Sequence, residues 1–84
     1  MKYCIITFRS VTPAQRGEGA LRKAGMECTL QRTPRWMEEQ GCGYSLRLRP
    51  ADGARGVALL RANQIPFRKV YLRGENGAME ELSL

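Results

Sequence analysis

The sequence contains no histidine among its 84 residues. Histidine is the commonest general base of enzymes and the commonest protein ligand of transition metals, so its absence excludes Ser-His-Asp and Cys-His catalytic arrangements. The three cysteines include no Cys-x-x-Cys pair and cannot complete a four-ligand zinc site without borrowing a carboxylate. We therefore expect no metal and no resident cofactor.

A long hydrophobic run is also missing. No segment approaches the roughly 20 apolar residues that cross a bilayer, and Arg9 interrupts the apolar start before a signal-peptide core could form. Cys4, Cys28 and Cys42 are odd in number and far apart, which is a poor framework for disulfides and suits a reducing compartment. These features predict a cytoplasmic protein that does not enter the membrane.

Acidic residues are few and unevenly placed. The net charge is +6, but residues 75–84 contain three glutamates and no basic residue, so residues 1–74, with 14 basic and 5 acidic side chains, carry +9. The length suffices for one domain, which we expect to span residues 1–74 and to be followed by a short acidic tail. The charge would attract nucleic acid, phosphate-rich ligands or an acidic protein surface. By itself it does not indicate which of these the protein binds.

The first half of the chain alternates between strand and helix patterns. Residues 2–9 are rich in β-branched and aromatic side chains and predict a buried strand. Residues 12–24 begin with Thr-Pro and end before a glycine, which predicts a helix. Residues 26–32 alternate as a half-exposed strand does. Cys4 and Cys28 share the parity of apolar strand neighbours, which predicts two inert core thiols. The inner face of the helix would hold Ala14, Gly17, Leu21 and Ala24.

The second half repeats this order. A strand is predicted over residues 44–49, a helix from Pro50 to Asn63, and a last strand over residues 67–72. The inner face of the second helix would hold Ala54, Val57 and Leu60. The order β-α-β-β-α-β predicts an α+β fold of the ferredoxin-like, split βαβ kind, in which two helices cover one face of a four-stranded antiparallel sheet.

Cys42 is the one cysteine predicted outside a strand. It lies between Gly41 and Gly43, where missing side chains leave the backbone free to bend and the thiol open to a reactant. This makes Cys42 the candidate catalytic or carrier residue. The alternative is that Cys42 fills a gap behind Trp36 and that its glycines only shape a turn.

Several arginines are predicted near Cys42 at one end of the sheet: Arg9, Arg32, Arg35, Arg47 and Arg49. Cations favour a thiolate over a thiol, and lowering a reference pKa of about 8.5 by two units raises the ionised fraction at pH 7 from roughly 3% to roughly 75%. Guanidinium forks also suit phosphate, carboxylate and sulfur oxyanions. The alternative is a solvated basic rim.

The sheet face away from the helices is a second candidate site. By parity it would display Tyr3, Arg47, Phe67, Lys69 and Tyr71. Aromatic rings among cations suit base stacking and phosphate contact in single-stranded nucleic acid. However, residues 45–49 lack the aromatic side chain that ribonucleoprotein-type domains carry on a central strand. We therefore favour a homodimer or another protein partner over RNA on this face.

Three segments together resemble a known family. They are Ile-Thr-Phe-Arg-Ser at residues 6–10, Thr-Pro-Arg at residues 33–35 and Gly-Cys-Gly-Tyr-Ser-Leu-Arg-Leu at residues 41–48. Over about residues 1–72 the chain is similar to short bacterial proteins described as selenium/sulfur carrier-like. It lacks the Cys-Pro-x-Pro helix start by which better-known bacterial sulfur carriers present their cysteine.

The resemblance implies a role for Cys42. This residue would carry sulfur or selenium as a persulfide or selenosulfide, with Arg35 and Arg47 stabilising the terminal anion. The implied partners are a cysteine desulfurase-like donor and an acceptor protein, and the chain would be a carrier without turnover of its own. The alternative function is a non-catalytic binding module, dimeric or bound to an acidic protein or RNA through the basic aromatic sheet face.

Overall fold

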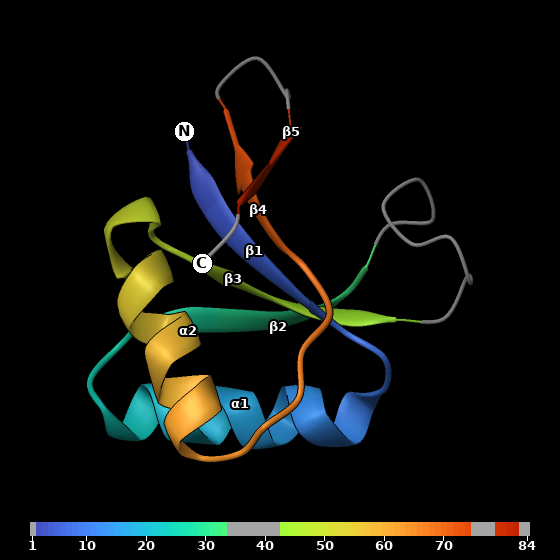
Figure 1. Cartoon of the computed structure of the whole chain (residues 1–84), viewed down its shortest axis with the longest axis vertical. Coiled ribbons are helices and arrows are strands. Elements are labelled where there is room, and N and C mark those ends of the chain that lie inside the picture. Colours follow the sequence, from blue (N-terminus) through green and yellow to red (C-terminus); the bar gives the residue numbers. More distant parts are fainter. Residues whose placement is uncertain (1, 34–42, 75–78, 83–84) are drawn as a thin grey trace.

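The chain forms an antiparallel sheet with two helices packed on it (Figure 1). The structure, a computed structural model, describes residues 2–33, 43–74 and 79–82. Neither helix in this part of the chain is long and apolar enough to span a membrane. The elements are β1 (Tyr3–Phe8), α1 (Val11–Lys23), β2 (Cys28–Arg32), β3 (Tyr44–Leu48), the short 3-10 helix η2 (Pro50–Asp52), α2 (Gly53–Ala62), β4 (Val70–Arg73) and β5 (Met79–Leu82).

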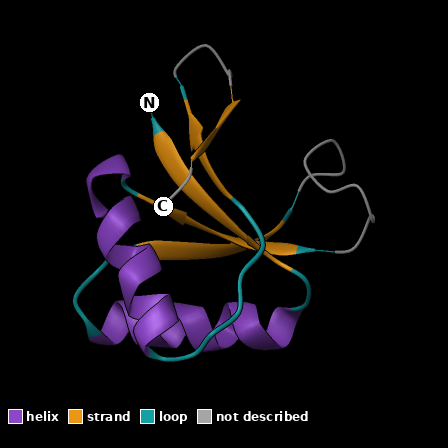
Figure 2. Cartoon of the chain, viewed as in Figure 1, coloured by secondary structure: helices purple, strands orange, loops and turns teal. Residues whose placement is uncertain are grey.

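The strands lie in the order β2-β3-β1-β4-β5, and all neighbours are antiparallel. Because β3 separates β1 from β2, the β1-α1-β2 connection crosses over one strand, as in a split βαβ unit. Figure 2 shows both helices on the same side of the sheet. The predicted α+β class, with two helices and an antiparallel sheet, is therefore confirmed.

The prediction of four strands is wrong, because part of the expected acidic tail forms a fifth strand. β5 pairs with β4 from Val70 and Leu82 to Arg73 and Met79. Leu82 packs against the core, and the Glu81 carboxylate lies 3.6 Å from Lys69 Nζ. These contacts attach the strand to an edge of the sheet that would otherwise be open.

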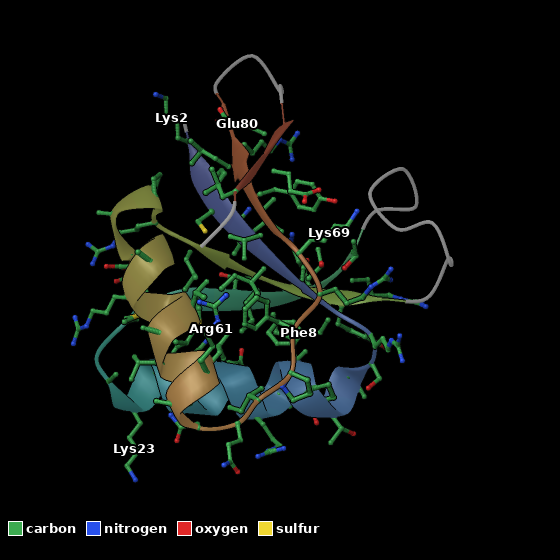
Figure 3. The ribbon with its side chains drawn as sticks, viewed as in Figure 1. Lys2, Phe8, Lys23, Arg61, Lys69 and Glu80 are labelled. Atoms are coloured by element: carbon green, nitrogen blue, oxygen red, sulfur yellow. The ribbon has the colours of Figure 1, made fainter. Side chains whose placement is uncertain are left out.

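The core lies between the sheet and the helices. Strand alternation turns Cys4, Ile6 and Phe8 of β1 toward the helices, next to Leu46 and Leu48 of β3, and each of these side chains is buried. Figure 3 shows Phe8 between the sheet and the helices, while Lys2 points outward. Full burial of one such aliphatic or aromatic side chain contributes about 1.5–3 kcal/mol. The predicted inward parity of β1 and β3 is confirmed.

Helix α1 begins at Val11 after Ser10, one residue before the predicted Thr12 start. Pro13 therefore lies in the first turn, where its missing N–H is not needed. The predicted end is confirmed: Gly25 has a φ of 85°, and its N–H donates to the carbonyl of Arg22. A left-handed residue after the last turn is a common helix ending that favours glycine.

The inner face of α2 differs from the prediction at one position. Val57 and Leu60 are buried as expected, but Ala54 is exposed. The inward stripe is Gly53, Gly56, Val57 and Leu60, which follows helical spacing and leaves Ala54 outside it. Glycine has no side chain that contributes to a hydrophobic pattern, so the sequence does not indicate that Gly53 and Gly56 face inward.

The last predicted strand, residues 67–72, begins three residues later than expected because of a β-bulge. The Thr7 N–H donates to the Lys69 carbonyl at 2.8 Å, while the Arg68 N–H donates to the Thr7 carbonyl at 2.7 Å. Two residues thus oppose one, which reverses the alternation of the side chains that precede them. Phe67 turns toward α2, where the Arg61 guanidinium lies 5.6 Å from its ring centroid. The prediction that Phe67 lies on the outer face is wrong.

Two glycines of α1 test the contact between the helix and the core. A Cβ on Gly17 would lie 3.1 Å from Leu60 Cδ2 and 3.2 Å from Leu46 Cδ1, whereas a Cβ on Gly19 has no described atom within 4 Å. Alanine is favoured over glycine in helices by about 0.5–1 kcal/mol, so Gly19→Ala should raise the free energy of unfolding by about that amount. Gly17→Ala should lower it by about 1 kcal/mol through overpacking. Urea denaturation measures both, and equal stabilisation would contradict this packing.

Candidate functional site

The predicted site is centred on residues that follow β2 and precede β3 in the sequence. Gly41, Cys42 and Arg35 lie outside the described residues. Gly43 is described: it is buried, and its carbonyl accepts a hydrogen bond from the Thr33 N–H at 3.0 Å. Gly43 therefore extends the β2–β3 ladder by one pair. This pair is the described end of the sheet nearest in sequence to Cys42.

Two buried hydroxyls accompany this pair. Ser45 is 0% exposed and Thr33 is 8% exposed, and neither side-chain oxygen has a hydrogen-bond partner among the described residues. Leaving such a group buried and unpaired costs about 1–3 kcal/mol. The neighbouring Thr7 hydroxyl differs, because it accepts a hydrogen bond from the Lys69 N–H at 3.0 Å. The hydroxyls of Thr33 and Ser45 are thus buried polar groups near Gly43 whose hydrogen-bonding capacity the described residues leave unsatisfied.

Sequence reasoning missed both hydroxyls. In the sequence, Ser45 alternates with apolar neighbours, as an ordinary polar residue of a strand does. Its burial arises from its place between Gln31 of β2 and Thr7 of β1, which are its cross-strand partners. No local pattern indicates which serine or threonine of a strand will be buried without a partner.

Two of the predicted arginines lie toward the same end of the sheet. Arg32 is the last residue of β2, is exposed, and has its guanidinium carbon 5.9 Å from the ring centroid of Tyr44. Arg9 is exposed and directly follows Phe8, whose cross-strand partner is also Tyr44. Both cations therefore belong to the strand ends that flank Gly43.

Arg47 lies elsewhere. Its guanidinium carbon is 4.5 Å from the ring centroid of Tyr3, at the start of β1. Arg47 lies four positions after Gly43 along the strand. At roughly 3.3 Å per residue, the distance between the two residues is about 13 Å. The structure does not bring Arg47 to the end of the sheet where Gly43 lies.

The outer face carries the other predicted side chains. Tyr71 is half-buried and opposes Ile5 across β1 and β4. Lys69 is exposed and forms its ion pair with Glu81 of β5. Tyr3, Arg47, Lys69 and Tyr71 thus share this face, which Phe67 does not reach.

The other two cysteines are confirmed as core residues. Cys4 is 1% exposed, and burial raises the pKa of its thiol to about 11. Cys28 is 6% exposed, and burial raises the pKa of its thiol, although the Arg22 guanidinium acts in the opposite direction. A buried thiol with a raised pKa is a poor nucleophile, because the thiolate is the reactive form.

A comparison with known families identifies the class of protein. The fold is a small antiparallel α+β domain in which two of the three cysteines are sealed in the core. Residues 3–72 match the family described as "Putative Se/S carrier protein-like", and the chain belongs to this family. The match includes position 42 and ends within β4. No curated protein and no solved structure matches the chain.

The burial of Cys4 and Cys28 predicts their resistance to alkylation. In the native protein, iodoacetamide should modify both at least 100-fold more slowly than in guanidinium chloride. The rate at Cys4 should stay low up to pH 9, because a thiol with a pKa near 11 is still protonated there. Peptide mass spectrometry after timed quenching measures each site separately. Modification of Cys4 at the denatured rate would show that the core is not closed around it.

Proposed function

We propose that this protein carries sulfur or selenium on the thiol of Cys42, as a persulfide or selenosulfide, and passes it between partner proteins. The observation that carries this proposal is the family match, which spans the cysteine and gives the cargo in its description. The chain contributes no histidine that could act as a general base. A carrier needs none, because its cargo moves by exchange between thiols.

The burial of the other cysteines supports Cys42 as the carrier. Transfer of sulfur between proteins requires a thiolate that a partner can reach. Cys4 and Cys28 are buried, and their pKa values are raised. Of the three thiols in the sequence, Cys42 is the one that these two properties leave available.

Each transfer is balanced without an added oxidant. The Cys42 thiolate attacks the terminal sulfur of a donor persulfide, R–S–SH. The donor S–S bond breaks, its electron pair leaves on the donor cysteine as a thiolate, and the new bond gives Cys42–S–SH. An acceptor thiolate then attacks the same terminal sulfur and releases the Cys42 thiolate. With selenium, the terminal atom is selenium and the steps are unchanged.

Arginines and hydroxyls at this end of the sheet support an anion on Cys42. Arg9 and Arg32 belong to the strand ends that flank Gly43, and Arg35 follows in the sequence. Cations lower the pKa of a nearby thiol, and hydrogen bonds to the charged form act in the same direction. We infer that Thr33 and Ser45, whose buried hydroxyls have no partner among the described residues, act as positioning residues for that anion.

Loading of sulfur from a donor enzyme tests the carrier function. After incubation with a cysteine desulfurase and cysteine, the intact mass of the protein should increase by one sulfur atom, and a reductant should reverse the increase. Cys42→Ser should gain no sulfur. Cys28→Ala is the matched control, because it removes a buried thiol and should still load. Equal loading of Cys42→Ser and the native protein would overturn the proposal.

The two hydroxyls have a separate test. Loss of one hydrogen bond to a charged group corresponds to roughly a tenfold change, so Ser45→Ala and Thr33→Val should each slow alkylation of Cys42 at pH 7 by about that factor. They should also move its pH profile to higher pH. The control is Thr29→Val, an exposed threonine of β2, the strand that Thr33 directly follows. A purely structural role would change stability and leave the pH profile unmoved.

A further inference from the structure

A surface groove lies at the opposite end of β2 and β3 from Gly43. Its volume is about 930 Å³, and its lining includes residues of the turn that precedes β2 and of the 3-10 helix η2. The buried side chains of Met26, Cys28 and Leu48 form its apolar floor. The basic side chains that line it are Lys2, Arg22, Arg47 and Arg49, and Glu27 is the acidic residue of the lining. The groove therefore combines an apolar floor with a rim of net positive charge.

Two of these cations are already held by carboxylates. Arg49 Nε lies 3.1 Å from Asp52 Oδ2, and Arg22 Nη2 lies 3.4 Å from Glu18 Oε2. Lys2 and Arg47 have no ion-pair partner among the described residues. These two cations can accept a new anion without breaking an existing pair.

Tyr3 connects the groove to the outer face of the sheet. It lines the groove, and its ring lies under the guanidinium of Arg47 at 4.5 Å. Its cross-strand partner on β4 is Arg73, which is exposed. A half-buried aromatic ring between two arginines is a surface on which a nucleic-acid base can stack, since guanidinium planes and aromatic rings both serve this purpose.

The chemistry of the outer face decides between nucleic acid and a second protein surface. Protein interfaces have an apolar core in which charged residues are depleted. On this face Ile5 is 2% exposed, whereas Thr29, Arg73 and the Lys69–Glu81 ion pair are exposed. Cations and two half-buried tyrosines therefore reach the surface of this face, and the aliphatic side chain does not. This exposure reverses the preference for a dimer that the sequence alone suggested.

We propose that the groove and the adjoining strand surface around Tyr3 bind single-stranded nucleic acid. One base stacks on the Tyr3–Arg47 pair, and the phosphates contact Lys2, Arg47 and Arg73. The site does not include Cys42 and does not depend on the carrier function. Single-strand binding domains combine cationic grooves with aromatic stacking in this way.

Fluorescence anisotropy with a labelled single-stranded RNA of about 12 nucleotides, a length within the usual range of such sites, tests the proposal. At low salt the native protein should bind, and Tyr3→Leu should weaken binding roughly tenfold by loss of stacking. Arg47→Gln should weaken binding and reduce the slope of log K against log salt by about 0.7, the value for one phosphate of a single strand. Cys42→Ser should bind as the native protein does.

Arg16→Gln is the matched control, because it makes the same charge change at an exposed position of α1. Arg73→Gln is a second variant at an exposed position, in case Tyr3→Leu weakens folding. Equal losses of affinity for Arg16→Gln and Arg47→Gln would show that binding depends on net charge alone, which would overturn the proposed site. Absence of RNA binding at low salt, or tighter binding of an acidic peptide that is unaffected by Tyr3→Leu, would also overturn it.

Discussion

The whole architecture depends on the burial of β1 between two neighbouring strands. From Cys4 to Phe8 each residue is at most 3% exposed, and the strand pairs with β3 on one side and β4 on the other. Its inward side chains meet the helices, and α1 approaches closely enough for Gly17 to touch Leu60. A central strand with both edges paired has no free backbone groups, so its position determines where the ends of β3 and β4 lie.

This arrangement separates two sites along β3. At its beginning, Gly43 pairs with Thr33, and the buried hydroxyl of Ser45 has no partner among the described residues. At its end, Arg47 stacks on Tyr3 above the basic groove. The proposed carrier function would need one surface for the cargo and one for recognition of partners. Gly43 and Arg47 are four strand positions apart, which is roughly 13 Å. This separation leaves room for two distinct surfaces on a small domain.

Much of the fold was predictable because its core elements follow simple periods. Alternation identified the inward sides of β1 and β3, and the left-handed Gly25 marked the end of α1. The errors have specific physical causes. A bulge opposite Thr7 turned Phe67 to the helix side, and glycines rather than Ala54 form the inner stripe of α2. Of the predicted site, the structure separates Arg47 from the strand ends around Gly43, because strand pairing holds it against Tyr3.

The sequence by itself determined which reactive and charged groups the protein has: no histidine, three cysteines and an excess of basic residues. It also determined that residues 3–72 belong to a carrier-like family. These properties depend on which residues are present and on short motifs. Only the tertiary structure decided that Cys4 and Cys28 are buried in the core, that the Ser45 hydroxyl is buried with no partner among the described residues, and that Met79–Leu82 adds a fifth strand to the sheet. Burial and partnership depend on contacts between segments far apart in the chain, and no local pattern contains them.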